Sequence, residues 1–197
     1  MIVSWYCSKR FLRQRVEILT KSTLFIMMAP SGVGKSYLAK TIAETHEDCV
    51  IISRDAIRFA LLKDGEDYFA HEKEVVKKYY DAISQALKVH KYVIADATHI
   101  TCKSRAEFFN KVKIPSNTRV VGVWIEVDLP TAIKQNEART GRARVPENVI
   151  RRMYKQKVSP REDEPFDEIV FVSRHTDMTI TNKDATIKSV VDRLSEL

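Results

Sequence analysis

The stretch that decides the fold is "TLFIMMAPSGVGKSYLAKTIAE", Thr23 to Glu44. Its first seven residues carry no charge, which is typical of a strand buried on both faces of a parallel sheet. Its last eight residues have apolar side chains at helical spacing. The loop between them is rich in small residues. The stretch therefore predicts a strand, a tight loop and a helix in direct succession.

The loop "APSGVGKS", Ala29 to Ser36, follows the phosphate-binding pattern G-x-x-x-x-G-K-[ST], except that Ala29 replaces the first glycine. In this arrangement, backbone N–H groups and the helix N-terminus converge on phosphate oxygens. Lys35 is expected to bridge the terminal phosphates of a nucleotide, and the Ser36 hydroxyl to bind Mg²⁺. The other loop residues expected to hold the nucleotide are Ser31, Gly32, Val33 and Gly34. The competing interpretation is a glycine-containing turn that precedes a lysine.

Short β-rich segments alternate with longer helical patterns along the chain, which is typical of a parallel sheet covered by helices. The expected strands are Thr23–Ala29, Cys49–Ser53, Tyr92–Ala95, Arg119–Val127 and Glu168–Val172, with a short edge strand at Met178–Thr181. Residues 72–89 place six apolar side chains on one helical face, which we interpret as core: Val75, Val76, Tyr79, Tyr80, Ile83 and Leu87. Ser104 with Glu107 forms a capping-box pattern, and Pro130 and Pro146 suit the first turns of two helices.

Composition limits the class of protein. A chain of 197 residues with 44% hydrophobic content suits one domain, which we expect at residues 23–197 after an N-terminal extension at 1–22. No apolar run reaches the ~20 residues of a membrane helix and the start lacks signal-peptide order, so we expect a cytoplasmic protein. Three widely spaced cysteines argue against a Cys zinc site. The formal charge of +7 favours a polyanionic partner such as nucleic acid.

Two acids stand at the ends of predicted strands: Asp55 in "IISRDAIR" and Asp96 in "YVIADAT". Ligands of parallel sheets collect at the carboxyl ends of the strands, so both carboxylates should face the phosphate loop. Asp96 suits the orientation of water on Mg²⁺, with a helix N-cap or turn as its alternative. Asp55 is interpreted either as an N-cap or as the group that faces an acceptor hydroxyl. Arg58, three residues on, lies near the same helix face and can hold an anionic acceptor.

A third cluster is "NEARTGRARVPENVIRRMYKQ", where Arg139, Arg142 and Arg144 surround Gly141 between two predicted helices. Arginines that close over a transferring phosphoryl group stabilise its negative charge. We therefore interpret residues 136–157 as a lid. A solvated basic loop is the alternative.

The segments "APSGVGKS", "SRDAIR", "IADATH" and "ARTGRARVPENVIRRMYKQ" together resemble, in order and spacing, the kinase domain of phage-type polynucleotide 5′-kinases. They are also similar to the wider P-loop kinases that include zeta toxins and chloramphenicol phosphotransferases. The resemblance covers about residues 23–172. It implies a three-layer α/β P-loop NTPase fold with a parallel sheet in the order 2-3-1-4-5, a helical lid, and ATP and Mg²⁺ as ligands.

The resemblance also implies roles for individual residues. Lys35 and Ser36 would bind the donor phosphates, Asp55 would activate the acceptor 5′-hydroxyl, and Arg58 would hold the acceptor's 3′-phosphate. Asp96 matches the family's strand-end acid.

The lid arginine of the family has no direct counterpart. Counting back from "VP" puts Thr140 at that position. The lid role therefore passes first to the neighbouring Arg139 and second to Arg142.

These features predict an ATP-dependent kinase that phosphorylates the 5′-hydroxyl of DNA or RNA ends. The main alternative is a small-molecule kinase of the same fold, acting on a nucleoside, a sugar nucleotide or an antibiotic. It would need a closed acceptor pocket, where a polynucleotide kinase needs an open channel. A non-catalytic nucleotide-gated binding module is a third possibility. Ala29 favours it and Asp55 argues against it.

Overall fold

The computed structural model of the chain describes residues 21–174 and 191–194. In this part of the chain, five parallel strands form one sheet in the order β2-β3-β1-β4-β5, with β1 at its centre. The strands are β1 (Thr23–Met28), β2 (Cys49–Ser53), β3 (Tyr92–Asp96), β4 (Arg119–Val127) and β5 (Glu168–Arg174). This arrangement confirms the predicted 2-3-1-4-5 α/β fold.

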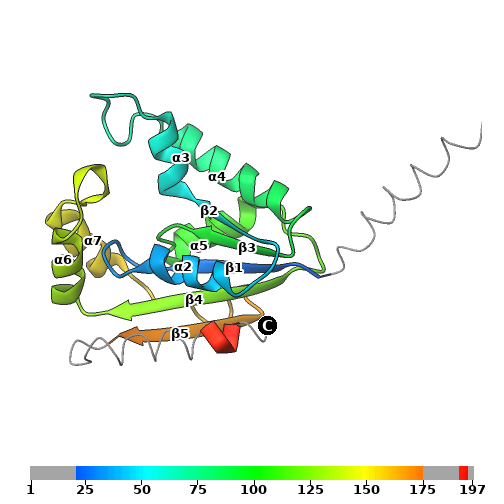
Figure 1. Cartoon of the computed structure of the whole chain (residues 1–197). Helices are drawn as coiled ribbons and strands as arrows, with labels where there is room; N and C mark the ends of the chain where they lie inside the picture. Colours follow the sequence, from blue (N-terminus) through cyan, green and yellow to red (C-terminus); the bar gives the residue numbers. More distant parts are fainter. Residues whose placement is uncertain (1–20, 175–190, 195–197) are drawn as a thin grey trace, which may run out of the picture.

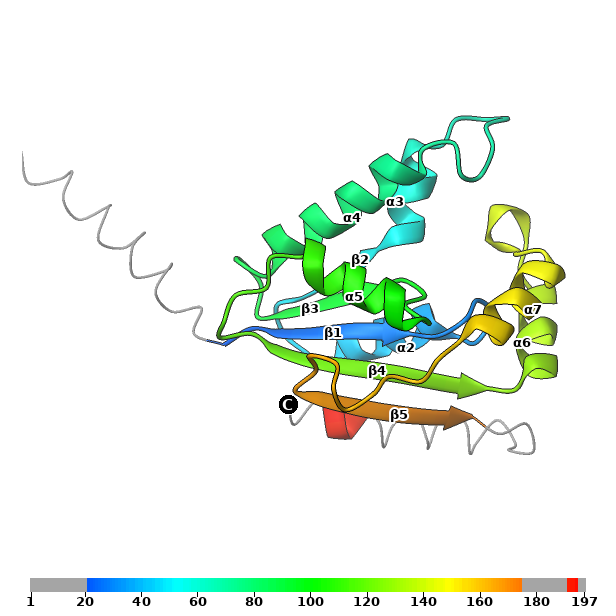
Figure 2. The same cartoon turned by 180° about the vertical axis from the view of Figure 1, so that it is seen from behind.

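Helices cover both faces of the sheet and make three layers (Figure 1). Helix α2 (Lys35–Glu44) packs on one face, and α4 (Glu72–Ala86) and α5 (Cys102–Lys111) pack on the other, as the reverse view in Figure 2 also shows. The remaining helical elements are α3 (Arg54–Leu61), α6 (Leu129–Glu137), the 3-10 turn η1 (Gly141–Ala143) and α7 (Glu147–Gln156).

Strand β1 is apolar throughout because both of its faces are buried. Phe25 and Met27 pack in the core beside α2, whereas Leu24, Ile26 and Met28 pack in the core under α4 and α5. All five side chains are at most 1% exposed. A run without charge is what a strand between two helical layers requires, because a charged side chain on either face would be buried without water.

Most predicted strand bounds are confirmed. Strands β2 and β4 span the predicted residues, while β1 ends one residue earlier, β3 one later and β5 two later than expected. The predicted edge strand at 178–181 and nearly all of the N-terminal extension at 1–22 lie outside the described residues.

The apolar stripe of residues 72–89 belongs to the core, as predicted. Its buried members are Val75, Tyr79, Ile83 and Leu87, while Val76 and Tyr80 are partly buried. Helix α4 itself ends at Ala86 and has 15 residues. Neither it nor any other helix of residues 21–174 and 191–194 is long and apolar enough to cross a membrane.

Two helix starts differ from the predictions. The N-cap of α5 is Thr101, whose extended backbone lets its hydroxyl accept a hydrogen bond from the Ser104 N–H over 3.1 Å. The predicted capping box of Ser104 with Glu107 is therefore wrong, because Ser104 is the third residue of a helix that begins earlier. Pro130 lies in the first turn of α6 as predicted, whereas Pro146 is the N-cap of α7.

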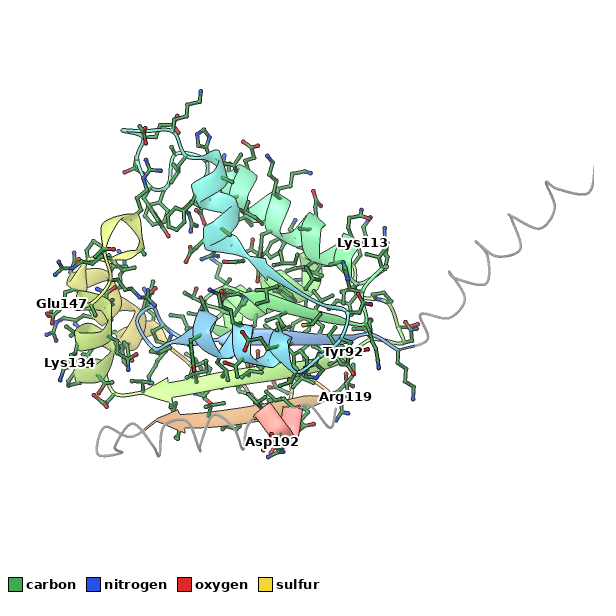
Figure 3. All side chains as sticks on the ribbon, viewed as in Figure 1. Tyr92, Lys113, Arg119, Lys134, Glu147 and Asp192 are labelled. Carbon is green, nitrogen blue, oxygen red and sulfur yellow. The ribbon has the colours of Figure 1, made fainter. Side chains whose placement is uncertain are left out.

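The predicted lid consists of the end of α6, η1 and α7. Figure 3 places Glu147 of the lid, and Lys134 of α6 just before it, beyond the carboxyl ends of the strands, and Tyr92 near the opposite end of β3. The buried Asn136 joins the two sides of the lid. Its amide donates to the Val145 carbonyl over 2.7 Å and accepts from the Val145 N–H over 3.0 Å. The lid thus lies at the carboxyl end of the sheet, where the phosphate loop also lies.

Candidate active site

The phosphate loop connects β1 to α2 and depends on glycine. Gly32 has a φ of 93°, and a Cβ atom there would lie 2.5 Å from the Ala132 carbonyl oxygen. Gly34, with a φ of 81°, precedes α2 as its N-cap, and no side chain caps this helix. Within the described residues, the first N–H groups of α2 thus receive no capping side chain, which suits the binding of an anion at the helix N-terminus.

Ala29, which replaces the first glycine of the pattern, fits the loop without strain. Among the described non-glycine residues, positive φ angles occur at Asp48 and His99 and not at Ala29. The Ala29 side chain is fully buried, and its N–H donates to the Thr98 carbonyl over 2.9 Å. Alanine is therefore compatible with the backbone of the loop at this position.

Lys35, Ser36 and Asp96 form a donor cluster at the end of the central strands. Asp96 is the last residue of β3, opposite Met27 of β1, and is 4% exposed. Its carboxylate accepts a hydrogen bond from the Ser36 hydroxyl over 2.8 Å and another from the Lys35 ammonium group. The N-cap interpretation of Asp96 is wrong, since Thr101 caps α5.

The donor cluster fits the predicted Mg²⁺ site in its chemistry. Hard divalent cations prefer oxygen ligands, and Ser36 and Asp96 supply a hydroxyl and a carboxylate next to each other. Lys35 adds a positive charge beside them, as phosphate binding requires.

Asp55, Arg58, Tyr68 and Glu72 form an acceptor cluster built from α3, the α3–α4 loop and α4. The Arg58 guanidinium donates to Asp55 over 2.5 Å, to the Tyr68 hydroxyl over 2.9 Å and to Glu72 over 2.6 Å. The Tyr68 hydroxyl in turn donates to the same Asp55 oxygen over 3.1 Å. The Tyr68 ring also lies 4.5 Å from the guanidinium carbon. Asp55 is thus held in one orientation by two donors.

Burial and charge differ sharply within the acceptor cluster. Arg58 is 2% exposed, whereas Asp55 is 59% exposed. Burial alone would lower the pKa of Arg58, but the hydrogen bond to Glu72 and the neighbouring charges raise it above its ordinary value. The cluster therefore has a fixed, charged arginine behind an accessible carboxylate.

Asp55 is not the cap of its helix. The N-cap of α3 is Ser53, whose hydroxyl accepts a hydrogen bond from the Ala56 N–H over 3.4 Å. Asp55 lies in the first turn, where a negative charge is favoured by the helix dipole. The N-cap interpretation of Asp55 is therefore wrong, and its carboxylate serves the acceptor cluster instead.

One pocket is lined by members of both clusters, namely Lys35 and Ser36 of the donor cluster and Asp55 of the acceptor cluster. Its lining residues are Pro30, Ser31, Gly32, Lys35, Ser36, Arg54, Asp55, Ala97, Thr98 and Arg139. The lid thus reaches the phosphate loop through Arg139. Arg142 lies elsewhere, since its guanidinium donates to the Asp64 carboxylate over 2.9 Å in the α3–α4 loop.

Sequence reasoning did not single out Arg54, Tyr68 or Glu72. Arg54 directly precedes Asp55, and its Nε atom is buried without a hydrogen-bond partner among the described residues. Its place next to a candidate catalytic acid was a signal that could have identified it. Tyr68 and Glu72 had no such signal, because they reach Arg58 from another loop and another helix.

His99 is a buried residue behind the site. It adopts a left-handed backbone with a φ of 42°, and its Nε2 atom lies 3.0 Å from the Tyr79 hydroxyl. Burial, and then the positive charges of Arg54, Lys35 and Arg105, lower the pKa of His99 to about 3. The imidazole is therefore neutral at ordinary pH.

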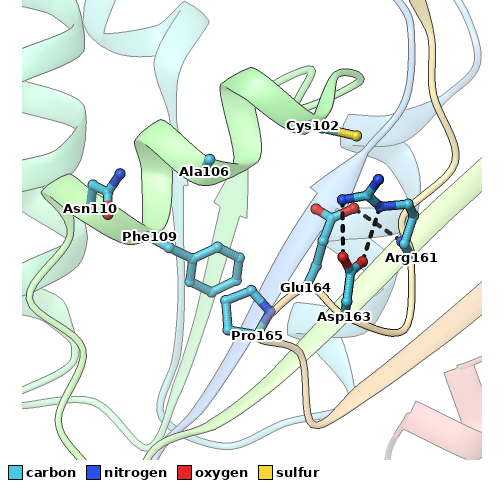
Figure 4. Close-up of a pocket in the computed structure, with 8 residues that line it drawn as sticks. All are labelled: Cys102, Ala106, Phe109, Asn110, Arg161, Asp163, Glu164 and Pro165. Atoms are coloured by element: carbon cyan, nitrogen blue, oxygen red, sulfur yellow. Dashed lines mark hydrogen bonds and ion pairs between the residues drawn. The ribbon is translucent and has the colours of Figure 1, made fainter.

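A second cavity, of about 320 Å³, lies between α5 and the segment before β5 (Figure 4). Its charged groups are already paired: Arg161 binds Asp163 over 3.0 Å, and Glu164 binds the buried Arg105 over 2.5 Å. Neither the phosphate loop nor the acceptor cluster contributes to its lining. The smaller pocket at the phosphate loop is therefore the candidate active site.

Comparison with known proteins gives a family. The model of a family described as "AAA domain" matches residues 24–160, which include the phosphate loop, both clusters and the lid. No curated protein matches the chain.

Solved structures share the fold at low sequence identity. A gluconokinase from Sinorhizobium meliloti 1021 is 16% identical, with a TM-score of 0.55 over 90% of this chain and 95% of its own. A fungal RNA kinase is 14% identical, with a TM-score of 0.63 over 90% of this chain and 44% of its own. A chain of the Pnkp1/Rnl/Hen1 RNA repair complex is 21% identical, with a TM-score of 0.60 over 68% of this chain and 43% of its own. The chain thus spans less than half the length of the two RNA-processing relatives.

Proposed function

Because the chain belongs to this AAA domain family, and its fold is that of a P-loop kinase, we propose that it phosphorylates the 5′-hydroxyl of a DNA or RNA end with ATP as donor. The observation that carries the proposal is the shared pocket, in which the Asp55 carboxylate lines the same space as Lys35 and Ser36 of the phosphate loop. A base for an acceptor hydroxyl and a site for donor phosphates are thus adjacent. Direct phosphoryl transfer requires that proximity.

The donor side acts mainly through electrostatics. We assign Lys35 to the terminal phosphates and the backbone N–H groups of residues 31–36 to the remaining phosphate oxygens. Ser36 and Asp96 would hold Mg²⁺, which when bound neutralises charge that develops on the phosphates. Arg139, which lines the pocket from the lid, is assigned to the transferring group, because it alone of the two lid candidates lines the pocket.

The acceptor side acts through Asp55 and Arg58. Asp55 would accept the proton of the attacking hydroxyl and orient its oxygen, and Arg58 would contribute positive charge toward an acceptor phosphate. Two of the structural relatives are named for RNA: the fungal RNA kinase and the RNA repair complex. The formal charge of +7 also supports a nucleic-acid acceptor.

One observation favours a small-molecule acceptor instead. Arg58 is 2% exposed and already donates to Asp55 and Glu72, so it meets an acceptor phosphate only after these contacts rearrange. Binding of an uncharged sugar would not require these contacts of Arg58 to rearrange. One structural relative, the gluconokinase, is named for a small-molecule acceptor.

A transfer assay with γ-labelled ATP distinguishes the two. The acceptors are 5′-hydroxyl oligonucleotides of DNA and RNA, nucleoside 3′-phosphates, unphosphorylated nucleosides and a panel of sugars. The proposal requires label on oligonucleotides and nucleoside 3′-phosphates, with nucleosides poor in comparison. Arg58→Ala should remove that preference for the phosphate. Label on sugars alone would establish the small-molecule activity and overturn the proposal. No transfer to any acceptor would support a binding module.

A further inference from the structure

The lid, together with the part of α6 that precedes it, is strongly basic. Residues 134–157 contain eight of the 33 lysines and arginines but two of the 26 acidic residues, so they account for +6 of the formal charge of +7. All other residues together contribute +1. Solubility does not explain so uneven a charge distribution, because net charge anywhere on the surface would keep the protein soluble.

Four exposed cations of residues 134–157 have no acidic partner among the described residues. Lys134, Arg144, Arg152 and Lys155 are exposed, and none of them forms an ion pair within the part of the chain that the structure describes. In contrast, Arg142 pairs with Asp64. The positive charge of these four side chains is therefore available to an external anion.

The position of these cations relates them to the pocket. The lid lies beyond the carboxyl ends of the strands, where Figure 3 labels Lys134 and Glu147. Arg139, from the same segment, lines the pocket with Lys35 and Asp55. The basic lid surface, which we define as Lys134, Arg144, Arg152 and Lys155, thus belongs to the segment that reaches the site of transfer.

We propose that the basic lid surface binds the phosphodiester backbone of the acceptor strand beyond its terminal nucleotide. This inference rests on the proposed function and specifies its substrate as a strand several nucleotides long. A single sugar or nucleotide presents no repeating row of phosphates. Four unpaired cations outside the pocket match a repeating anion instead, and each contact with the backbone releases counterions.

The dimensions and composition of the lid agree with a strand. Helix α7 has ten residues and is therefore about 15 Å long, which corresponds to about four nucleotides at ~3.4 Å each. The exposed large hydrophobic residues of the described chain are Tyr37, Phe69, Val89, Val158 and Phe171, so none lies between 134 and 157. A membrane-binding surface would need apolar residues for insertion, and the lid offers none.

The test uses the full chain with Arg152→Ala and Lys155→Ala combined. Its matched control is Lys111→Ala with Lys113→Ala, which removes two exposed cations at the far end of α5, where Figure 3 labels Lys113. Binding of a 12-nucleotide 5′-hydroxyl oligonucleotide is measured by fluorescence anisotropy across a range of salt concentrations. The lid variant should bind roughly tenfold more weakly, and its salt slope should fall by about 1.4, since each single-strand phosphate contact contributes about 0.7. The control should match the unmutated protein.

Kinetics separate this inference from the proposed function. In the lid variant, kcat/KM should fall for the 12-nucleotide acceptor and stay unchanged for a nucleoside 3′-phosphate, which reaches only the pocket. An equal effect on both acceptors, or no effect on oligonucleotide binding, would overturn the lid assignment while leaving the kinase activity intact. Failure of the unmutated protein to phosphorylate either acceptor would instead overturn the proposed function. The anisotropy measurement would still decide whether the lid binds a strand.

Discussion

The donor and acceptor clusters are built in different ways, although they share a pocket. Lys35 and Ser36 of the donor cluster are neighbours in sequence, and Asp96 reaches them from the end of an adjacent strand. The backbone of the loop and the sheet register fix their positions. The acceptor cluster instead depends on side chains from α3, the α3–α4 loop and α4, which meet around Arg58.

This difference separates what a P-loop kinase must keep from what it can vary. A donor site anchored by strands can serve any acceptor, because ATP is the same in each reaction. An acceptor site made of side chains on helices and a loop can change without disturbing the sheet. Variants of the two clusters should therefore differ in which property they lose.

The largest effect should come from Lys35→Ala. Loss of the charge that stabilises the transferring phosphates should reduce turnover by at least about 10³-fold. Among the described residues, the buried Asp96 would keep Ser36 alone as a side-chain partner, so the melting temperature should also fall. Transfer of γ-label and thermal unfolding measure the two effects.

The double variant Lys35→Ala with Asp96→Asn controls for that instability. Removal of both charges should recover part of the melting temperature without restoring transfer. Near-normal turnover in either variant would show that the loop does not hold the donor phosphates.

Asp55→Asn should act on turnover and spare the donor side. Loss of a general base costs about 10²–10⁴-fold, while ATP affinity should change little because Asp96 and the loop are untouched. Ser53→Ala is the matched control, because it removes the N-cap of the same helix at a cost of about 1 kcal/mol without touching the carboxylate. Turnover and the free energy of unfolding should therefore separate: the first falls in Asp55→Asn and the second in Ser53→Ala. Unchanged turnover in Asp55→Asn would remove Asp55 from the reaction.

The same contrast explains what could be predicted from the sequence. The strand order came from the resemblance of four segments. Lys35 and Ser36 came from one contiguous motif whose spacing is set by backbone geometry, and Asp96 came from its place at the end of a predicted strand. Asp55 was found because it directly follows a predicted strand, and Arg58 because it lies three residues further on, near the same helix face. Tyr68 and Glu72 were not, because their contacts with Arg58 depend on how the α3–α4 loop folds back. Chain neighbours can be recognised from spacing, whereas partners from separate elements require the tertiary structure.

His99, buried behind the site, offers a test that depends on pH. The charges of Lys35 and Arg54 contribute to its low pKa, after burial, and its partner Tyr79 lies on α4. The folded pKa of about 3 is below the unfolded value of 6.5, so only the unfolded state takes up this proton as pH falls through that range. Stability should therefore decrease by ~1.4 kcal/mol per pH unit below 6.5, or about 2 kcal/mol at pH 5.

Urea unfolding at pH 7.5 and pH 5 measures this loss. His99→Gln should be less stable at pH 7.5, since it disturbs a buried hydrogen bond, but its stability should depend less on pH in this range. Equal pH dependence in the variant and the unmutated protein would mean that His99 is protonated in the folded state.

The smallest effect should come from the ion pair that joins the lid to the acceptor side. Arg142 is 47% exposed and Asp64 is fully exposed, so their 2.9 Å contact is a surface pair. Such pairs stabilise proteins by about 0–1 kcal/mol, because water screens the charges and both side chains lose freedom. A double-mutant cycle of Arg142→Ala and Asp64→Ala should therefore give a coupling energy within that range.

Arg142→Ala should also reduce turnover less than Arg139→Ala, because Arg139 lines the pocket and Arg142 contacts the α3–α4 loop. The opposite order, with Asp64→Ala harmless, would move the phosphate-stabilising role to Arg142 and show that the lid must close further than it does here.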